Sequence, residues 1–143
     1  MKTVQKSTVI IILLTFLTLV GCASQGETAL TVTGNIANEE SWTEKQVNDM
    51  DAIDVEYTNK DGEVSMYTGV LISDLLNLAR PNSDASAVVF LADDGYSAET
   101  TLEEVMSCTN CIVSFQDQGG FRIVMPDFSS KLQVKGVIEI QVK

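Results

Sequence analysis

The chain has 143 residues, a length that suits one domain, with 45% hydrophobic and 20% charged residues, as in ordinary globular proteins. Its 9 basic residues stand singly against 20 acidic ones, a net charge of −11, so no basic cluster exists to neutralise nucleic acid phosphates. Histidine is absent, which removes the commonest metal ligand and general base, and we assign no catalytic residue and no metal site.

Residues 1–21 have the pattern of a bacterial export signal. Two lysines precede an apolar run, 9–20, that is too short to span a bilayer as a helix but suits the core of a signal peptide. The sequence LVGC at 19–22 resembles a lipobox, which implies cleavage before Cys22 and a diacylglyceryl group on its thiol. We expect a protein of the bacterial cell envelope that is anchored to the membrane by lipid and faces the periplasm or the cell exterior.

The mature chain is more acidic than its precursor. Removal of residues 1–21 takes away two lysines and no acidic residue, which leaves 7 basic against 20 acidic side chains, a net of −13. Such a surface is repelled by anionic lipid. We predict that residues 22–28 form the lipidated end and a polar tether, and that residues 29–143 form one domain.

Apolar periodicity divides residues 29–143 into strands and short helices. In chain order it predicts a strand at 30–34, a helix after a capping box at Ser41 and Glu44, a hairpin of 53–57 and 64–68 around Asp61-Gly62, a helix at 70–79, a strand at 88–92, a helix at 101–107 after a second capping box, strands at 112–116 and 121–125, and a last strand at 134–142. Strands outnumber helices, so we predict an α+β domain with a mixed β-sheet.

Five short segments add a family resemblance. They are LTVTG at 30–34, YTGV at 67–70 leading into DLL at 74–76, VF at 89–90 with DGYS at 94–97, GFRIVMP at 120–126, and VKGVIEI at 134–140. In this order they resemble the oxidoreductase molybdopterin-binding domain of the sulfite oxidase family. The resemblance implies that fold, a molybdenum cofactor held through its dithiolene, and a protein cysteine as a further sulfur ligand.

The resemblance implies the scaffold more than the catalysis. Asp54 stands at the position that best matches the family's ligand cysteine, and no thiol occurs between Cys22 and Cys108. Asp127 adds negative charge in the stretch after Pro126, the stretch that approaches the cofactor phosphate in the family. The remaining candidates for cofactor binding are Tyr96, Arg122, Ser129 and Lys135. The cofactor is left unassigned, with molybdopterin as the group that the resemblance suggests.

Arg122 is a candidate for anion binding on residue chemistry alone. It follows Gly119-Gly120, and a glycine-rich turn beside a guanidinium can hold an anion with backbone amides and the side chain together. The alternative is a surface arginine paired with one of the many carboxylates. Lys135 has the same two interpretations.

Cys108 and Cys111 have the spacing of thiol oxidoreductases, in an oxidising compartment. The pair follows a predicted helix, and a helix carboxyl terminus disfavours a thiolate. We therefore favour a structural or labile disulfide, or two free thiols, over a catalytic pair.

Together these features predict a lipoprotein whose domain is a ligand-binding or accessory redox module, with a small anionic ligand or an envelope redox partner. One alternative is an active oxidoreductase that uses molybdopterin or the Cys108/Cys111 pair. The other is a structural domain for interactions in the envelope.

Overall fold

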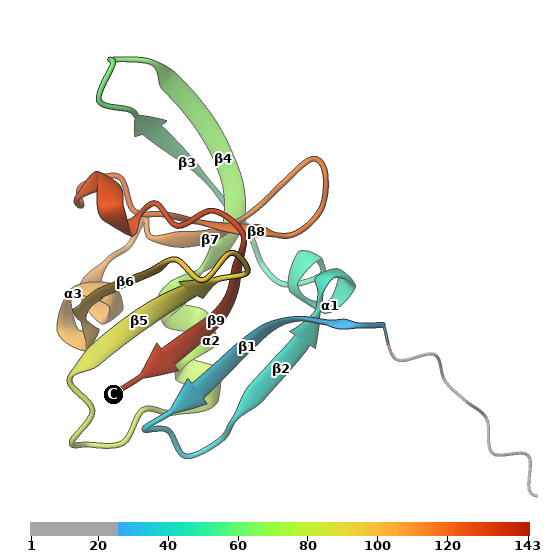
Figure 1. Cartoon of the computed structure of the whole chain (residues 1–143), viewed down its shortest axis with the longest axis vertical. Helices are drawn as coiled ribbons and strands as arrows, with labels where there is room; N and C mark the ends of the chain where they lie inside the picture. Colours follow the sequence, from blue (N-terminus) through green and yellow to red (C-terminus); the bar gives the residue numbers. More distant parts are fainter. Residues whose placement is uncertain (1–25) are drawn as a thin grey trace, which may run out of the picture.

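The computed structural model describes residues 26–143, so the predicted export signal and Cys22 lie outside the described residues. Nine strands in this part of the chain form two sheets, and three short α-helices pack around them (Figure 1). The predicted α+β architecture with mixed sheets is confirmed. No helix within 26–143 is long and apolar enough to cross a membrane.

The larger sheet joins the first and last strands of the domain. Its strands lie in the order β2 (Glu40–Thr43), β1 (Thr28–Gly34), β9 (Val137–Val142), β5 (Ala87–Ala92) and β6 (Ser97–Thr101). β1 and β9 pair in parallel, whereas the other neighbours are antiparallel. The last strand of the chain therefore occupies the centre of this sheet.

The smaller sheet consists of two antiparallel hairpins side by side. Its strands lie in the order β3 (Ile53–Thr58), β4 (Val64–Leu71), β7 (Ile112–Phe115) and β8 (Phe121–Val124). β3 pairs along its whole length with the Val64–Gly69 part of β4, but β4 pairs with β7 only from Gly69 to Leu71. The outer part of the β3–β4 hairpin consequently projects from the body of the domain (Figure 1).

Two hydrophobic clusters cover opposite faces of the smaller sheet, because side chains alternate along each strand. Val70, Val113 and Ile123 lie in register and join the main core between the sheets and the helices. Their neighbours on the other face form a second cluster of Val55, Tyr57, Ile112 and Val124, with Tyr67 and Leu71 packed against it. The domain thus buries apolar surface on both faces of this sheet.

The first helix begins two residues later than predicted. Ser41 lies in β2, where Trp42 is buried opposite Leu30, and this strand pairing keeps the segment extended. The capping box is formed instead by Thr43 and Gln46, and it opens α1 (Glu44–Asn48). The prediction of a cap at Ser41 is therefore wrong, although the helix exists.

The other two helices follow their sequence signals closely. α2 (Ile72–Ala79) begins after Leu71 because Val70 and Leu71 are paired with β7, and it ends where Arg80 adopts a left-handed conformation with φ 56°. α3 (Leu102–Ser107) opens with the predicted capping box, in which the Thr101 and Glu104 side chains bond reciprocally with the backbone. That second prediction is confirmed.

Strand β6 and the 3₁₀ helix η1 (Ser130–Leu132) are elements that the sequence pattern does not predict. β6 has the sequence SAETT, which lacks apolar alternation because it is the edge strand of the larger sheet. The last predicted strand, 134–142, is shorter than expected, since β9 begins at Val137. The preceding segment runs beside β8 instead, where the Ile123 amide donates to the Val134 carbonyl at 2.8 Å.

Candidate functional site

A crevice opens where β4 separates from β7. The cavity has a volume of about 420 Å³, and we call it the Arg122 crevice. Its lining comes from the outer part of β4, from the end of β7 and the turn that follows, and from β8: Met66, Tyr67, Thr68, Ser114, Phe115, Gln116, Asp117 and Arg122. The crevice exists because β4 extends beyond the three residues that pair with β7.

Arg122 is held against an aromatic wall. Its guanidinium carbon lies 5.0 Å from the centroid of the Tyr67 ring, and its Nη1 donates a hydrogen bond of 3.0 Å to the Tyr67 hydroxyl. Tyr67 in turn meets Tyr57 edge to face, with 6.3 Å between ring centroids. This stack fixes the position of the guanidinium and gives it a favourable cation–π contact.

The charge of Arg122 has no carboxylate partner within residues 26–143. The ion pairs in this part of the chain join Lys45 to Asp49 and Lys143 to Glu99, and both lie on the surface. The Nε of Arg122 is buried and makes no hydrogen bond. In a chain with 20 acidic residues, a half-buried guanidinium without a carboxylate is unusual, because a buried unsatisfied donor carries a desolvation cost.

Hydrogen bonds to the backbone hold the rest of the crevice in place. The buried Ser114 hydroxyl donates to the Thr68 carbonyl at 3.1 Å, which ties β7 to β4 just where the two strands part. The side-chain amide of Gln116 donates to the Phe121 carbonyl at 2.8 Å and closes the β7–β8 turn. The walls of the crevice are therefore largely preformed.

Lys135 is brought to the same place as Arg122. The two residues are partners in an isolated antiparallel bridge, so their side chains leave the sheet on the same face. Lys135 is exposed, whereas Arg122 is half-buried. Two of the five predicted binding residues thus lie side by side.

Asp54 is not brought to the crevice. It pairs with Thr68, and the Thr68 hydroxyl donates to its carboxylate at 2.6 Å. Arg122 lies in register with Ser114 and Gly69, which occupy the other face of the sheet. Asp54 and Arg122 therefore lie on opposite faces of the smaller sheet, and these two predicted residues are not brought together.

Tyr96 and Ser129 form a separate polar group around η1. The Tyr96 hydroxyl donates to the Lys131 carbonyl at 2.8 Å, and the Ser129 hydroxyl accepts a hydrogen bond of 3.4 Å from the Lys131 amide. Both side chains stabilise the local backbone, and neither lines the Arg122 crevice. The predicted set of five residues is thus split over three places.

Cys108 and Cys111 are joined by a disulfide, with 5.6 Å between their Cα atoms. Cys108 is the C-cap residue of α3, and Cys111 is fully buried directly before β7. The pair therefore lies at a helix carboxyl terminus, where the dipole disfavours a thiolate. The bridge links α3 to the smaller sheet.

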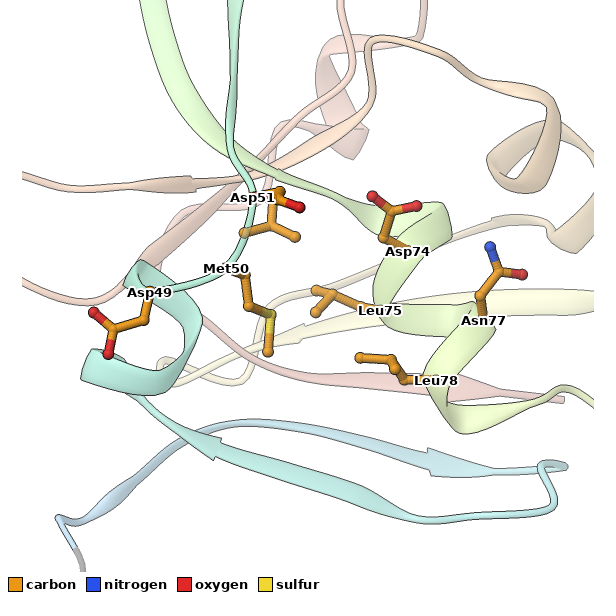
Figure 2. A pocket seen from close by; sticks show the side chains of 8 residues that line it. Asp49, Met50, Asp51, Asp74, Leu75, Asn77 and Leu78 are labelled. Carbon is orange, nitrogen blue, oxygen red and sulfur yellow. The ribbon is translucent and has the colours of Figure 1, made fainter.

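A second cavity, of about 400 Å³, lies between the end of α1 and α2. Figure 2 shows Met50, Leu75 and Leu78 directed into this hollow, with Asp74 at its rim and the carboxylate of Asp49 turned outward. Its polar lining is acidic or neutral and includes no cation. This hollow therefore does not suit an anion, in contrast to the Arg122 crevice.

Sequence reasoning missed three polar or aromatic residues that shape the crevice, Tyr67, Ser114 and Gln116. Tyr67 belongs to the YTGV segment, but its contact with Arg122 depends on the register of β4 and β8 across β7. A buried serine in an apolar strand, IVSF, is the one local signal that pointed to this place.

Comparisons with known proteins support the fold and nothing beyond it. No family model matches the sequence, and no curated protein matches it either. A solved structure with a similar fold is the sulfane dehydrogenase SoxCD from Paracoccus pantotrophus, with a TM-score of 0.69 and 16% sequence identity. The match covers 84% of this chain and 39% of that chain. The predicted fold, an α+β domain of the sulfite oxidase type, is thereby confirmed, and this chain spans well under half of the similar one.

The described residues do not fit the molybdenum cofactor that this fold suggests. Such a site needs a protein thiolate, but Cys108 and Cys111 are bonded to each other at the end of α3. Asp54, the residue at the matching position, lies on the opposite face from Arg122. Of the five predicted residues in the described part of the chain, the two basic ones, Arg122 and Lys135, lie next to each other.

Proposed function

We propose that this protein is a lipid-anchored binding module of the bacterial envelope that holds a small anionic ligand at Arg122. The observation that carries the proposal is the half-buried guanidinium, fixed by Tyr67 and lacking a carboxylate, in the wall of a preformed crevice. Guanidinium groups bind carboxylates and other oxyanions through charge-assisted hydrogen bonds. The neighbouring Lys135 adds a second positive charge.

The chemistry of the crevice favours binding over catalysis. The lining contributes one carboxylate, Asp117, and no histidine or thiol. The hydroxyl of Ser114 is buried and already donates to the backbone, so it is not poised as a nucleophile. The positive potential of Arg122 therefore acts on a ligand that the site retains and does not transform.

The membrane anchor is a separate part of the proposal. It rests on the apolar run 9–20 and the lipobox-like sequence at 19–22, with Cys22 as the lipidated residue. Several acyl chains on one residue give stable attachment, since each buried methylene contributes about 0.8 kcal/mol. The acidic domain then stands in water beside the membrane.

Titration followed by nuclear magnetic resonance tests the anion site. The full chain in a nonionic detergent is titrated with acetate, sulfite, sulfate and phosphate while the Arg122 Nε–H signal and the backbone amide signals of the crevice residues are recorded. We expect saturable shifts for at least one anion at millimolar concentrations, and loss of binding in Arg122→Gln. The matched control is Lys143→Gln. Lys143 is an exposed cation that pairs with Glu99, and neither residue lines the crevice. Equal binding by the two variants, or no saturable shift, would overturn the proposal.

A further inference from the structure

One edge of β4 is free along the outer part of its hairpin. β3 pairs with one edge from Val64 to Gly69, but β7 begins to pair with the other edge only at Gly69. The segment 64–68 therefore has β3 on one side and no paired strand on the other, and its residues 66–68 line the Arg122 crevice. A free edge of this kind is a ready template for another extended chain.

The alternation of the strand defines which backbone groups face the crevice. The Thr68 carbonyl accepts from Ser114, so Thr68 directs its backbone groups away from β3. Because these directions alternate along a strand, Val64 and Met66 also present their N–H and C=O groups to the free edge. The outer part of β4 thus offers unpaired donors and acceptors within the described residues.

The side chains at this edge lack the features that usually prevent the addition of another strand. Val64 and Met66 are 60% and 67% exposed, although both are large and apolar. The segment 64–68, VSMYT, contains no proline and no charged residue, the devices that usually prevent strand addition. This edge has the composition of a binding surface.

We infer that the ligand of the Arg122 crevice is the carboxyl-terminal end of an extended peptide, an inference that rests on the proposed function. The peptide pairs with the free edge of β4 and places its terminal carboxylate on Arg122. β4 runs from Val64 toward Gly69, which is in register with Ser114 and Arg122 at the base of the crevice. A peptide that ends at Arg122 therefore runs parallel to β4.

The charges around the edge specify the rest of the peptide. The β3–β4 hairpin carries Asp54, Glu56, Asp61 and Glu63 against a single cation, Lys60. Positive side chains upstream of the terminal carboxylate complement this surface. Val64 and Met66 accommodate apolar side chains between them. Asp54 and Glu56 lie on the same face of the hairpin as Val64 and Met66, since Asp54 pairs with Thr68 and Glu56 with Met66. The preferred partner is a peptide that carries both basic and apolar residues upstream of a free carboxyl terminus.

A pair of synthetic heptapeptides tests the carboxylate contact. Both alternate lysine and valine and carry fluorescein at the amino terminus, and they differ only in a terminal carboxylate or carboxamide. Binding to the full chain in detergent is measured by fluorescence anisotropy. We expect the carboxylate peptide to bind at least tenfold more tightly, and Arg122→Gln to remove the difference. General charge attraction predicts the reverse order, because the amide is the more cationic peptide.

Met66→Pro tests the strand pairing separately from the anion contact. Proline removes the N–H that faces the free edge and leaves the bonds between β3 and β4, whereas Met66→Val retains that N–H as the control. We expect at least fivefold weaker peptide binding in Met66→Pro than in Met66→Val. A peptide with N-methylated alternate residues measures the same pairing without any change in the protein, and it should bind as weakly.

The outcomes separate the two proposals. Anion binding at Arg122 without tighter binding of the carboxylate peptide would overturn the peptide inference and leave the proposed function standing. If the unmodified chain binds neither the anions nor the carboxylate peptide at Arg122, both proposals are overturned. Dimerisation of the chain that Met66→Pro abolishes would also overturn the peptide inference, because a second copy would then occupy the free edge.

Discussion

Arg122 shows how one side chain acquires a role from its surroundings. Tyr67 and Tyr57 supply a rigid aromatic wall, and the β7–β8 hairpin holds the guanidinium over it. The preceding glycines are the sequence feature that singled out Arg122, and its role in anion binding stays a prediction. It could not show whether Arg122 was paired with a carboxylate, because that depends on side chains from other strands.

Glu104 should make the stability of the fold depend on acid pH. Its carboxylate accepts hydrogen bonds from Thr100 and Thr101, which lower its pKa below the ordinary value of 4.5. The stabilisation is therefore present above pH 4.5 and is lost as the pH falls through the lowered pKa. We expect Glu104→Gln to lower the midpoint of thermal unfolding at pH 7, with the gap closing on acidification. Glu103→Gln, in the same helical turn, should show no such closing gap.

Arg80 should gain stability on replacement by glycine. It is a non-glycine residue with φ 56° at the end of α2, and its backbone amide still closes the helix by donating to Leu76. Glycine adopts this conformation without steric cost, so Arg80→Gly should stabilise the fold by about 0.5–1 kcal/mol in chemical denaturation. Arg80→Ala retains the strain and serves as the control. A gain of equal size in Arg80→Ala would assign the effect to the side chain.

At the scale of elements, strands and helices followed from local patterns, whereas their pairing did not. The alternation around Asp61-Gly62 located the β3–β4 hairpin, and Thr101 with Glu104 located α3. Asp54 and Arg122 lie on opposite faces of the smaller sheet, a relation that depends on the register of four strands and that local patterns do not give. Val55 and Tyr57 are the neighbours that lie on the face of Arg122.

Gly69 controls the point at which β4 meets β7. A Cβ on this residue would collide with the Val113 carbonyl oxygen and lie 2.6 Å from the Cα of Ser114. We expect Gly69→Ala to destabilise the fold by about 1–3 kcal/mol, measured by urea unfolding, because backbone must move to admit the methyl group. Gly62 at the hairpin tip has open space around it, so Gly62→Ala should cost only the strain of its φ of 81°. Equal costs at the two glycines would contradict this account.

The disulfide should stabilise the join between α3 and β7. Its ends are three positions apart in sequence, so the closed loop is short and the entropic gain is modest, about 2 kcal/mol. We expect Cys108→Ser/Cys111→Ala to lower the unfolding free energy by that amount while anion binding at Arg122 is retained. Loss of binding together with an intact fold would instead indicate that the bridge takes part in the function.

At the scale of the whole molecule, the fold was the most predictable property and the site the least. Five segments in the right order were sufficient to predict the sulfite-oxidase-type fold. The solved structure that shares this fold is only 16% identical in sequence. The segments are those that build strands and turns, so they report the scaffold. The binding residues belong to surfaces that diverge freely once the scaffold is stable, and a family resemblance therefore carries little information about them.

The proposed anchor predicts a simple change in localisation. Cys22→Ala removes the thiol that receives the lipid, so we expect the variant to resist labelling with radioactive palmitate and to leave the membrane fraction. Ser24→Ala, in the neighbouring tether, should remain labelled and membrane-bound. Membrane association of an unlabelled Cys22→Ala protein would contradict the lipid anchor.

The parallel pairing of β1 with β9 gives the domain a fixed polarity. β1 leads away from Gly26, and β9 runs in the same direction, so Lys143 lies at the far end of a strand about 20 Å long (Figure 1). A fluorescent tag or an affinity handle added after Lys143 would therefore stand at the opposite end of the larger sheet from Gly26.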